Sequence, residues 1–432
     1  MRIDACFDSH VHWAANGEFV QRLALGGLTS AASLSSVTDE PSHRHGDWIL
    51  GFGWDDEAWT DAPSLKIIDA WESSKPAALS RRDGHAYWVN SAALRLAGID
   101  RNSEDPGGGR IGRDGEGRLT GVLIDRAMDL VRKHIPRSTA FDLRRHLLRG
   151  MQSFNRAGYT HVRDMTCDIE QWNEAVKLEQ SGLLTLAVEE YFWLQEPART
   201  DGVLVDLEKA RATRAKQLRV MGAKIFLDGA LGSGGAKLSR CYHGEAHSGL
   251  LLWEMQALKD ALRVFWEKGF AVAVHAIGDR AAEMIVDAAL EVGATGRTGA
   301  LHIEHGELIR PETILKMKAL EVEVHLQPAH WLSDRKWLGE KTGDLSQFAF
   351  PWRRLQEAGI PFDFGSDAPI EPASLPRMFE ALRESAKTGV PRLLGDPATY
   401  MRHRDLAWVP NCFTQIENDR PAQVVFRGEH LL

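Results

Sequence analysis

Eight short apolar runs recur along the chain, and most follow a helical stretch and end in Gly, Asp or Pro. They occupy residues 5–12, 158–165, 184–192, 218–229, 270–279, 300–308, 321–330 and 360–369. The spacing between most neighbours leaves room for one helix, as at residues 281–292 and 311–320. Strands that alternate with helices indicate a parallel sheet, and eight of them indicate closure into a (β/α)8 TIM barrel.

The longest gap separates the first two predicted strands and adds more than a hundred residues. We therefore assign residues 1–410 to the barrel, with residues 35–140 as a large insertion over the active site. Within it, residues 107–124 alternate around Asp-Gly and Glu-Gly steps, which predicts a β-hairpin. Residues 23–37 are rich in Ala, Ser, Gly and Leu, and we expect a helix there.

Composition and charge are those of an ordinary soluble globular protein. Of the 432 residues, 44% are hydrophobic and 26% charged, and no apolar run approaches the roughly 20 residues of a membrane span. The formal net charge is -8, without any block of Lys and Arg, so neither a nucleic acid nor a membrane is expected as partner. The four cysteines form no CxxC pair, and the N-terminus has polar residues where a signal peptide needs apolar ones, which favours the cytoplasm.

Candidate metal ligands begin in the first predicted strand, in the motif DSHVH. Side chains alternate along a strand, so Asp8, His10 and His12 project to one face. Neutral imidazoles suit zinc and similar first-row metals, and Asp8 could orient one of them. An HxH motif alone also occurs at structural positions, so its meaning depends on the rest of the chain.

Ionisable residues also stand at the carboxyl ends of later predicted strands, where barrel enzymes place their sites. They are Lys224, His275, His305 and Asp367. Each alone could be a buried or turn-capping residue, but together they indicate a site. Lys224 is the most informative, because a lysine within an apolar strand is costly to bury as an ammonium. Addition of carbon dioxide would turn it into an anionic carbamate able to bridge two metals.

Several longer stretches carry a family resemblance over most of the chain. They are DSHVH, WILGFGWDDEAW, RRDGHAYWVNSAALRLAGI, GGRIGRDGEGRLTGVL, KIFLDGALGSGGAKL, VHAIGDRA, HIEHGELIRPE, QPAHW and GSDAPIEP. The sequence thereby resembles the amidohydrolase superfamily, in the branch of YtcJ-like and N-substituted formamide deformylase-like proteins (amidohydrolase family 3). DGHAYWVNSAAL, VHAIGDRA and IEHGELI together are quite specific to this branch, whereas HxH is common to many hydrolases.

The resemblance implies a set of site residues. The implied metal ligands are His10, His12, carboxylated Lys224, His275, His305 and Asp367. It also suggests that His85 reaches the substrate from the insertion. As a separate hypothesis, we expect Asp367 to carry the proton in catalysis. Members usually carry a β-sandwich from both chain ends, but only nine residues precede His10 here. We therefore expect a reduced accessory sandwich, with residues 411–432 as a residual β-strand segment.

The function expected from these residues is hydrolysis of a non-peptide, amide-like C–N bond by a metal-activated hydroxide, with one or two divalent cations per chain. Zinc is expected, with other first-row metals open. Two alternatives remain: a mononuclear aminohydrolase that deaminates a heterocycle on the same barrel, and a catalytically silent binding or regulatory protein. The expected partner is a small-molecule substrate, and a homo-oligomer is left open.

Two finer expectations concern side-chain placement. In the sixth predicted strand, alternation puts His302 with Glu304 on one face and His305 with Leu301 and Ile303 on the other. Because barrel interiors favour branched apolar side chains, we expect the second face to point inward. The insertion also contains several tryptophans, which indicate either an apolar pocket, slightly favoured, or a core. These tryptophans are Trp54, Trp59 and Trp88.

Overall fold

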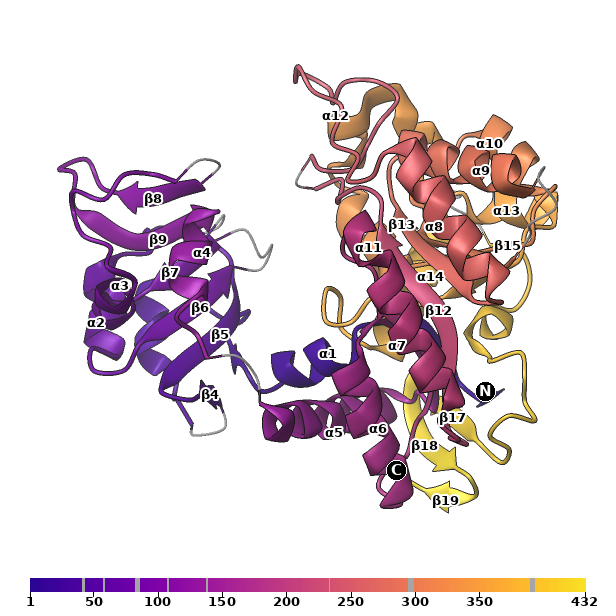
Figure 1. Ribbon diagram of the computed structural model, residues 1–432. Coiled ribbons are helices and arrows are strands. Elements are labelled where there is room, and N and C mark those ends of the chain that lie inside the picture. The colour runs from indigo at the N-terminus through magenta and orange to yellow at the C-terminus, as the bar shows by residue number, and fades with distance from the viewer. Residues whose placement is uncertain are drawn as a thin grey trace. The chain divides into compact units, whose positions relative to one another are not determined.

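The computed structural model describes residues 1–40, 43–56, 59–81, 86–106, 109–136, 139–232, 234–293, 299–388 and 393–432. The chain divides into two compact units, of which the larger comprises Met1–Gly17 with Leu143–Leu432 and the smaller Glu18–Asp142 (Figure 1). Among the helices so described, none is both long enough and apolar enough to cross a membrane.

The larger unit is built on an eight-stranded parallel sheet in which the strands follow one another in chain order. They are β2 (Phe7–Val11), β10 (His161–Cys167), β11 (Ala187–Trp193), β12 (Leu218–Phe226), β13 (Ala271–Ala276), β14 (Leu301–His305), β15 (Val322–Leu326) and β16 (Phe362–Phe364). Each predicted apolar run overlaps one of these strands, and β10 and β11 extend one or two residues beyond theirs. The first and last meet through a parallel bridge between Val11 and Ala368, which closes the sheet. The predicted (β/α)8 barrel is therefore confirmed.

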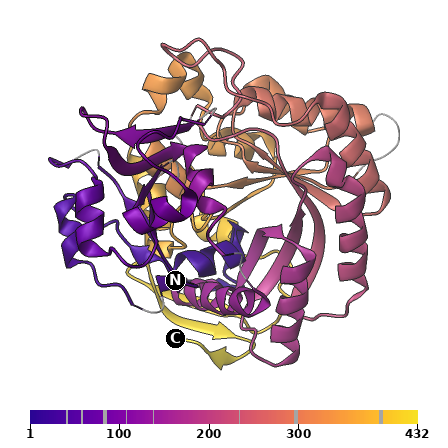
Figure 2. The same ribbon diagram turned by 60° about the vertical axis from the view of Figure 1, so that its left-hand side comes forward.

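Helices alternate with the strands of the larger unit, and Figure 2 shows several of them around the outside of the sheet. They are α1 (Trp13–Phe19), α5 (Ala140–Ala157), α6 (Ile169–Gln180), α7 (Thr200–Ala212), α8 (Met255–Glu267), α9 (Asp279–Gly293), α10 (Pro311–Met317), α11 (Pro328–Asp334), α12 (Leu338–Thr342), α13 (Trp352–Ala358) and α14 (Leu375–Thr388). Short 3-10 helices lie at Pro197–Arg199, Gly343–Phe348 and Pro397–Met401. In α9 the buried residues Ile285, Ala289 and Val292 recur at helical spacing, so one face packs against the sheet.

Charged side chains lie inside the barrel beside a small apolar cluster, and this corrects the predicted strand register. Three strands lie between β10, which carries Arg163, and β14, which carries Glu304, yet the guanidinium and carboxylate groups are 3.0 Å apart. Only side chains that point into the barrel can make that contact. Leu301 and Ile303 instead belong to the large apolar core, which also includes buried residues of the helices. The inward face of β14 is therefore the one that carries His302 and Glu304, because a buried ion pair occupies the place expected for branched apolar residues.

A four-stranded antiparallel sheet joins the two ends of the described chain. It runs in the order β1 (Arg2–Asp4), β17 (Phe413–Glu417), β18 (Arg420–Phe426) and β19 (Glu429–His430). Three of its strands lie in residues 411–432, the predicted accessory segment. Its buried residues include Ile416, Val424 and Phe426.

The smaller unit has a mixed seven-stranded sheet and short helices. The strands are β3 (Leu23–Ala24), β4 (Arg44–His45), β5 (Trp48–Trp54), β6 (Ala77–Arg81), β7 (Ala86–Val89), β8 (Gly109–Arg113) and β9 (Leu119–Asp125), and the helices are η1 (Ala32–Ser36), α2 (Leu65–Trp71), α3 (Ser91–Ala97) and α4 (Ala127–Arg132). Strands β8 and β9 form the predicted hairpin. The helix expected over residues 23–37 is wrong, because the short strand β3 and the 3-10 turn η1 form there instead. The Asp61 carboxylate accepts the backbone N–H groups of Ala31 and Ala32 at 2.9 and 2.8 Å and fixes the start of that turn.

The tryptophans of the predicted insertion form the core of this smaller unit. Trp54 and Trp88 are 1% and 0% exposed, and their rings are 6.2 Å apart, with Trp59 packed against both. The pocket that we slightly favoured for these tryptophans is therefore wrong. Residues 35–140 fall inside the unit, and their position over an active site stays a prediction.

Candidate metal centre

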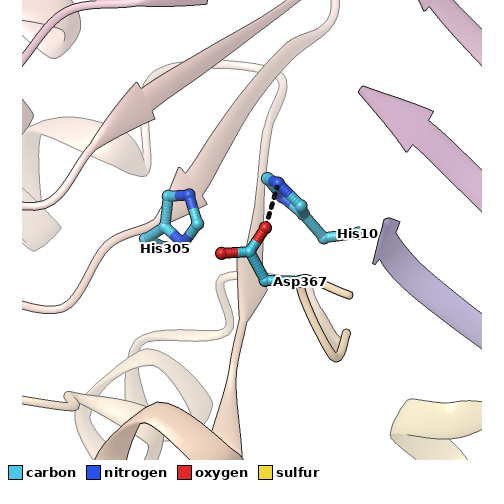
Figure 3. Close-up of side chains that lie close together, drawn as sticks. All are labelled: His10, His305 and Asp367. Carbon is cyan, nitrogen blue, oxygen red and sulfur yellow. Dashed lines mark ion pairs between the residues drawn. The ribbon is translucent and has the colours of Figure 1, made fainter. Parts of the chain in front are cut away.

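Three of the predicted ligands converge at the carboxyl end of the barrel. His10 lies in β2, His305 ends β14, and Asp367 follows β16. All three are buried, and their potential ligand atoms lie within 4.8 Å of one another (Figure 3). Two imidazoles and a carboxylate at this spacing are ligands that a divalent cation can bind.

Two of these residues have backbone conformations that direct their side chains to the site. His305 has a φ of 72° and Asp367 a φ of 62°, in the left-handed region that residues other than glycine rarely adopt. The turn at His305 breaks the alternation of β14, so Glu304 and His305 both contact the same group of residues. Strained backbone of this kind is typical of functional sites.

His10 is held in place by a chain of buried charges. Its Nδ1 lies 2.6 Å from Glu304 Oε2, and the other oxygen of Glu304 accepts from Arg163 at 3.0 Å. His10 Nε2 faces Asp367 Oδ1 at 3.3 Å and has no hydrogen-bond partner among the described residues. Burial lowers the pKa of His10 well below its ordinary value, which keeps the ring neutral with a lone pair available. Glu304 thus fixes the tautomer that a metal-binding histidine needs.

Replacing Glu304 by Gln is expected to weaken metal affinity about 10- to 100-fold, the usual effect of losing such an orienting carboxylate. The amide cannot balance the buried Arg163 charge or accept strongly from His10. Affinity can be measured by competition with a coloured chelator. Glu312→Gln, on a half-exposed side chain of α10, is the matched control. Equal metal affinity in the two variants would show that Glu304 does not support metal binding.

His12 reaches the same carboxylate from the end of β2. Its Nε2 lies 3.0 Å from Asp367 Oδ1, and its Nδ1 lies 3.1 Å from Thr166 Oγ1. Burial raises the pKa of Asp367, but the neighbouring His10 and His12 lower it more, so the net pKa is well below its usual range. Asp367 is therefore ionised at neutral pH, as a metal ligand must be.

Lys224 and His275 complete the group on β12 and β13. Lys224 is fully buried, its Nζ finds no hydrogen-bond partner within the part of the chain described, and burial lowers its pKa to about 8. The ring of His275 is centred 4.5 Å from that of His305, and its Nδ1 is likewise unpartnered among these residues. Burial lowers the pKa of His275 to about 3, so its ring is neutral. Buried nitrogens left without partners around one carboxylate fit a divalent cation.

Among the site residues that escaped prediction, two lie in the stretch QPAHW. Gln327 Oε1 accepts from His305 Nδ1 at 2.9 Å, which leaves the other ring nitrogen free to bind a metal. The ring of His330 stacks on His305, and its Nδ1 donates to Glu307 at 3.1 Å. Burial lowers the pKa of His330, but Glu307 and Asp367 raise it more, to about 9. Applying the strand-end rule to the seventh strand would have found both. The predicted substrate contact His85 lies outside the described residues.

Comparison with known proteins agrees with this geometry. Residues 5–398 match the model of a family described as "Amidohydrolase family". A Bacillus subtilis protein named as an amidohydrolase, YtcJ, is 32% identical over 383 residues, 84% of this chain and 70% of the relative. The N-substituted formamide deformylase of Arthrobacter pascens is 24% identical over 80% of this chain and 66% of its own length. The crystal structure of an uncharacterized metal-dependent hydrolase from Pyrococcus horikoshii aligns with a TM-score of 0.72 and 27% identity, covering 90% of this chain and 76% of that one.

Proposed function

The chain belongs to the amidohydrolase family, and from that premise we propose that it hydrolyses an amide-like C–N bond of a small molecule with the help of one or two divalent cations. The observation that carries the proposal is the convergence of His10, His305 and Asp367 at the carboxyl end of the barrel. The names of the Bacillus and Arthrobacter relatives support the same reaction class.

The residues that would hold the cations are the imidazoles, the lysine and the carboxylate of this group. They are His10, His12, Lys224, His275, His305 and Asp367. A bound divalent cation would supply a water molecule of lowered pKa and polarise the substrate carbonyl. Zinc suits the imidazole-rich set best.

Lys224 would contribute as a carbamate. Its neutral amine would add to carbon dioxide, forming one N–C bond and releasing one proton. Because burial lowers the pKa of this amine to about 8, its neutral fraction grows as the pH rises towards and through 8. The released proton would pass to solvent water.

Asp367 is the proposed proton carrier. It is ionised at neutral pH, and one oxygen already accepts from His12 at 3.0 Å, while the other lies 3.4 Å from His330 Nε2. The carboxylate would take a proton from the attacking water and deliver it to the leaving nitrogen. The His330 imidazolium, held by Glu307, would stabilise the ionised form between turnovers.

A screen tests the proposal directly. Metal-loaded protein is incubated with simple amides and N-substituted formamides, and released amine is measured by a fluorogenic label. Release that disappears with a chelator and returns with added zinc would support it. Ammonia released from amino-substituted heterocycles, without cleavage of amides, would favour the aminohydrolase. No turnover in either set by fully metal-loaded protein would favour a silent binding protein.

We predict more than one equivalent of metal per chain after reconstitution with zinc and bicarbonate, because a carbamate is useful chiefly as a bridge between two cations. Metal content is measured by plasma mass spectrometry, and the carbamate by ¹³C NMR after labelling with ¹³C-bicarbonate. Lys224→Met should abolish the carbamate signal and lower the stoichiometry. A stoichiometry fixed at one, with Lys224 unmodified, would contradict the binuclear centre.

A further inference from the structure

A row of aromatic side chains leads to the candidate metal centre along the ends of three neighbouring strands. Trp193 ends β11, Phe226 ends β12, and His275 lies near the end of β13. The ring centroids of Trp193 and Phe226 are 5.8 Å apart in an edge-to-face arrangement. Those of Phe226 and His275 are 5.2 Å apart. The three rings therefore form one continuous surface.

Strand alternation places this surface on the inner side of the barrel. Trp193 shares its face of β11 with Tyr191, whose ring lies against the interior guanidinium of Arg163. Phe226 shares its face of β12 with Lys224, and the Lys224 Nζ lies 4.7 Å from the centre of the Phe226 ring. The row thus belongs to the carboxyl-terminal mouth, where barrel enzymes bind substrates.

Exposure decreases along the row towards the centre. Trp193 is 41% exposed, Phe226 is intermediate, and His275 is only 8% exposed. Other tryptophans of the larger unit, such as Trp13 and Trp352, are fully buried. A single exposed hydrophobic residue needs no explanation. An exposed indole on the inner face of a barrel strand, in ring contact that continues to a metal-site histidine, has the character of a binding surface.

We propose that Trp193 and Phe226 form an apolar wall, the Trp193–Phe226 wall, that binds an aryl or arylalkyl substituent of the amide substrate. This inference rests on the proposed amide hydrolysis for the identity of the reacting group. The wall itself rests on the ring geometry. Two rigid aromatic side chains offer a third ring offset-stacked or edge-to-face contact, in addition to the burial of apolar area. A small amide such as a methylamide would leave the indole in water and gain neither.

Binding of an inert analogue tests the wall separately from catalysis. The probes are N-(2-phenylethyl)methanesulfonamide and N-methylmethanesulfonamide, which share the polar group and differ in the substituent. Calorimetric titration of the metal-loaded protein should show tighter binding of the phenylethyl compound. Trp193→Ala should weaken that binding about tenfold, as expected for loss of an aromatic contact and its buried area. Trp193→Phe should restore most of it.

Trp408→Ala is the matched control, because Trp408 packs on His161 at the opposite, amino-terminal end of β10. It should leave binding of both probes unchanged. Phe226→Leu, which keeps apolar volume but removes the ring, should fall between wild type and Trp193→Ala. Equal affinity of wild type for the two probes, or wild-type affinity in Trp193→Ala, would overturn the wall.

Steady-state kinetics test this inference separately from the proposed function. With N-(2-phenylethyl)formamide and N-methylformamide as substrates, Trp193→Ala should raise KM for the first about tenfold and leave kcat and the second substrate little changed. If wild type cleaves neither amide yet binds the phenylethyl sulfonamide through Trp193, the reaction class is wrong and the wall stands. If both amides are cleaved with equal kcat/KM in wild type and Trp193→Ala, the hydrolase stands and the wall is wrong.

Discussion

Asp367→Asn is expected to lower kcat for amide hydrolysis about 10³-fold, within the range for loss of a general acid–base group. The amide has nearly the shape of the carboxylate, so the fold should persist, with its backbone hydrogen bond to His10 O at 2.8 Å. It cannot accept a proton, however, and so cannot pass one to the leaving nitrogen. Most of the metal should remain, since the histidines and Lys224 are untouched.

The measurement combines steady-state kinetics, metal content and thermal unfolding on the same preparation. Asp344→Asn is a suitable control, because the Asp344 side chain is 87% exposed and its neighbour Arg240 is 3.9 Å away. Wild-type kinetics in Asp367→Asn would show that Asp367 does not carry the proton in the reaction.

His305→Ala is expected to lower metal affinity more than about 100-fold, beyond the effect of losing an outer orienting group. The centroid of its ring lies 4.7 Å from that of His10 and 4.5 Å from that of His275, so the variant removes an imidazole that packs against two other candidate ligands. His302→Ala is the informative comparison. His302 also points into the barrel, but its Nδ1 lies 3.0 Å from His325 Nε2. Its loss should therefore affect stability and leave metal binding nearly unchanged.

Chelator competition gives both affinities, and thermal unfolding in the presence of excess zinc gives both stabilities. Normal metal binding in His305→Ala together with loss of metal binding in His302→Ala would show that the metal binds beside His302 and not beside His305.

The barrel could be predicted from sequence because its strands are short apolar runs separated by helices, and this signal is local. The register of β14 could not, because most of the strand is buried and both of its faces lie against protein. Burial then does not distinguish the inward side. The inward side is set by Arg163, which pairs with Glu304 across 141 residues of sequence. The left-handed backbone at His305, which brings its side chain to the candidate metal centre, does not alter the hydrophobic pattern and cannot be predicted from it.

The candidate ligands could be proposed because residue type and position at strand ends are visible in the sequence. Their orienting partners could not. Glu304 meets His10 over a separation of 294 residues, and Gln327 meets His305 from the next strand. Such pairings follow from the closed sheet and cannot be read from either segment alone. The tryptophans of the smaller unit were misread for the same reason, since a core and a pocket have the same composition.

The closure of the barrel depends on the residues that form the candidate metal centre. Where β2 and β16 meet, the backbone N–H of Asp367 donates to His10 O at 2.8 Å, and that of His12 donates to Ala368 O at 2.8 Å. A cation bound by the side chains of His10 and Asp367 would therefore link the first strand of the barrel to the last. Metal occupancy would act as a reversible crosslink, stabilising the folded chain by mass action. Amide hydrogens of His12 and Asp367 should then exchange with deuterium faster in metal-stripped protein, while those in the middle of β12 keep their protection.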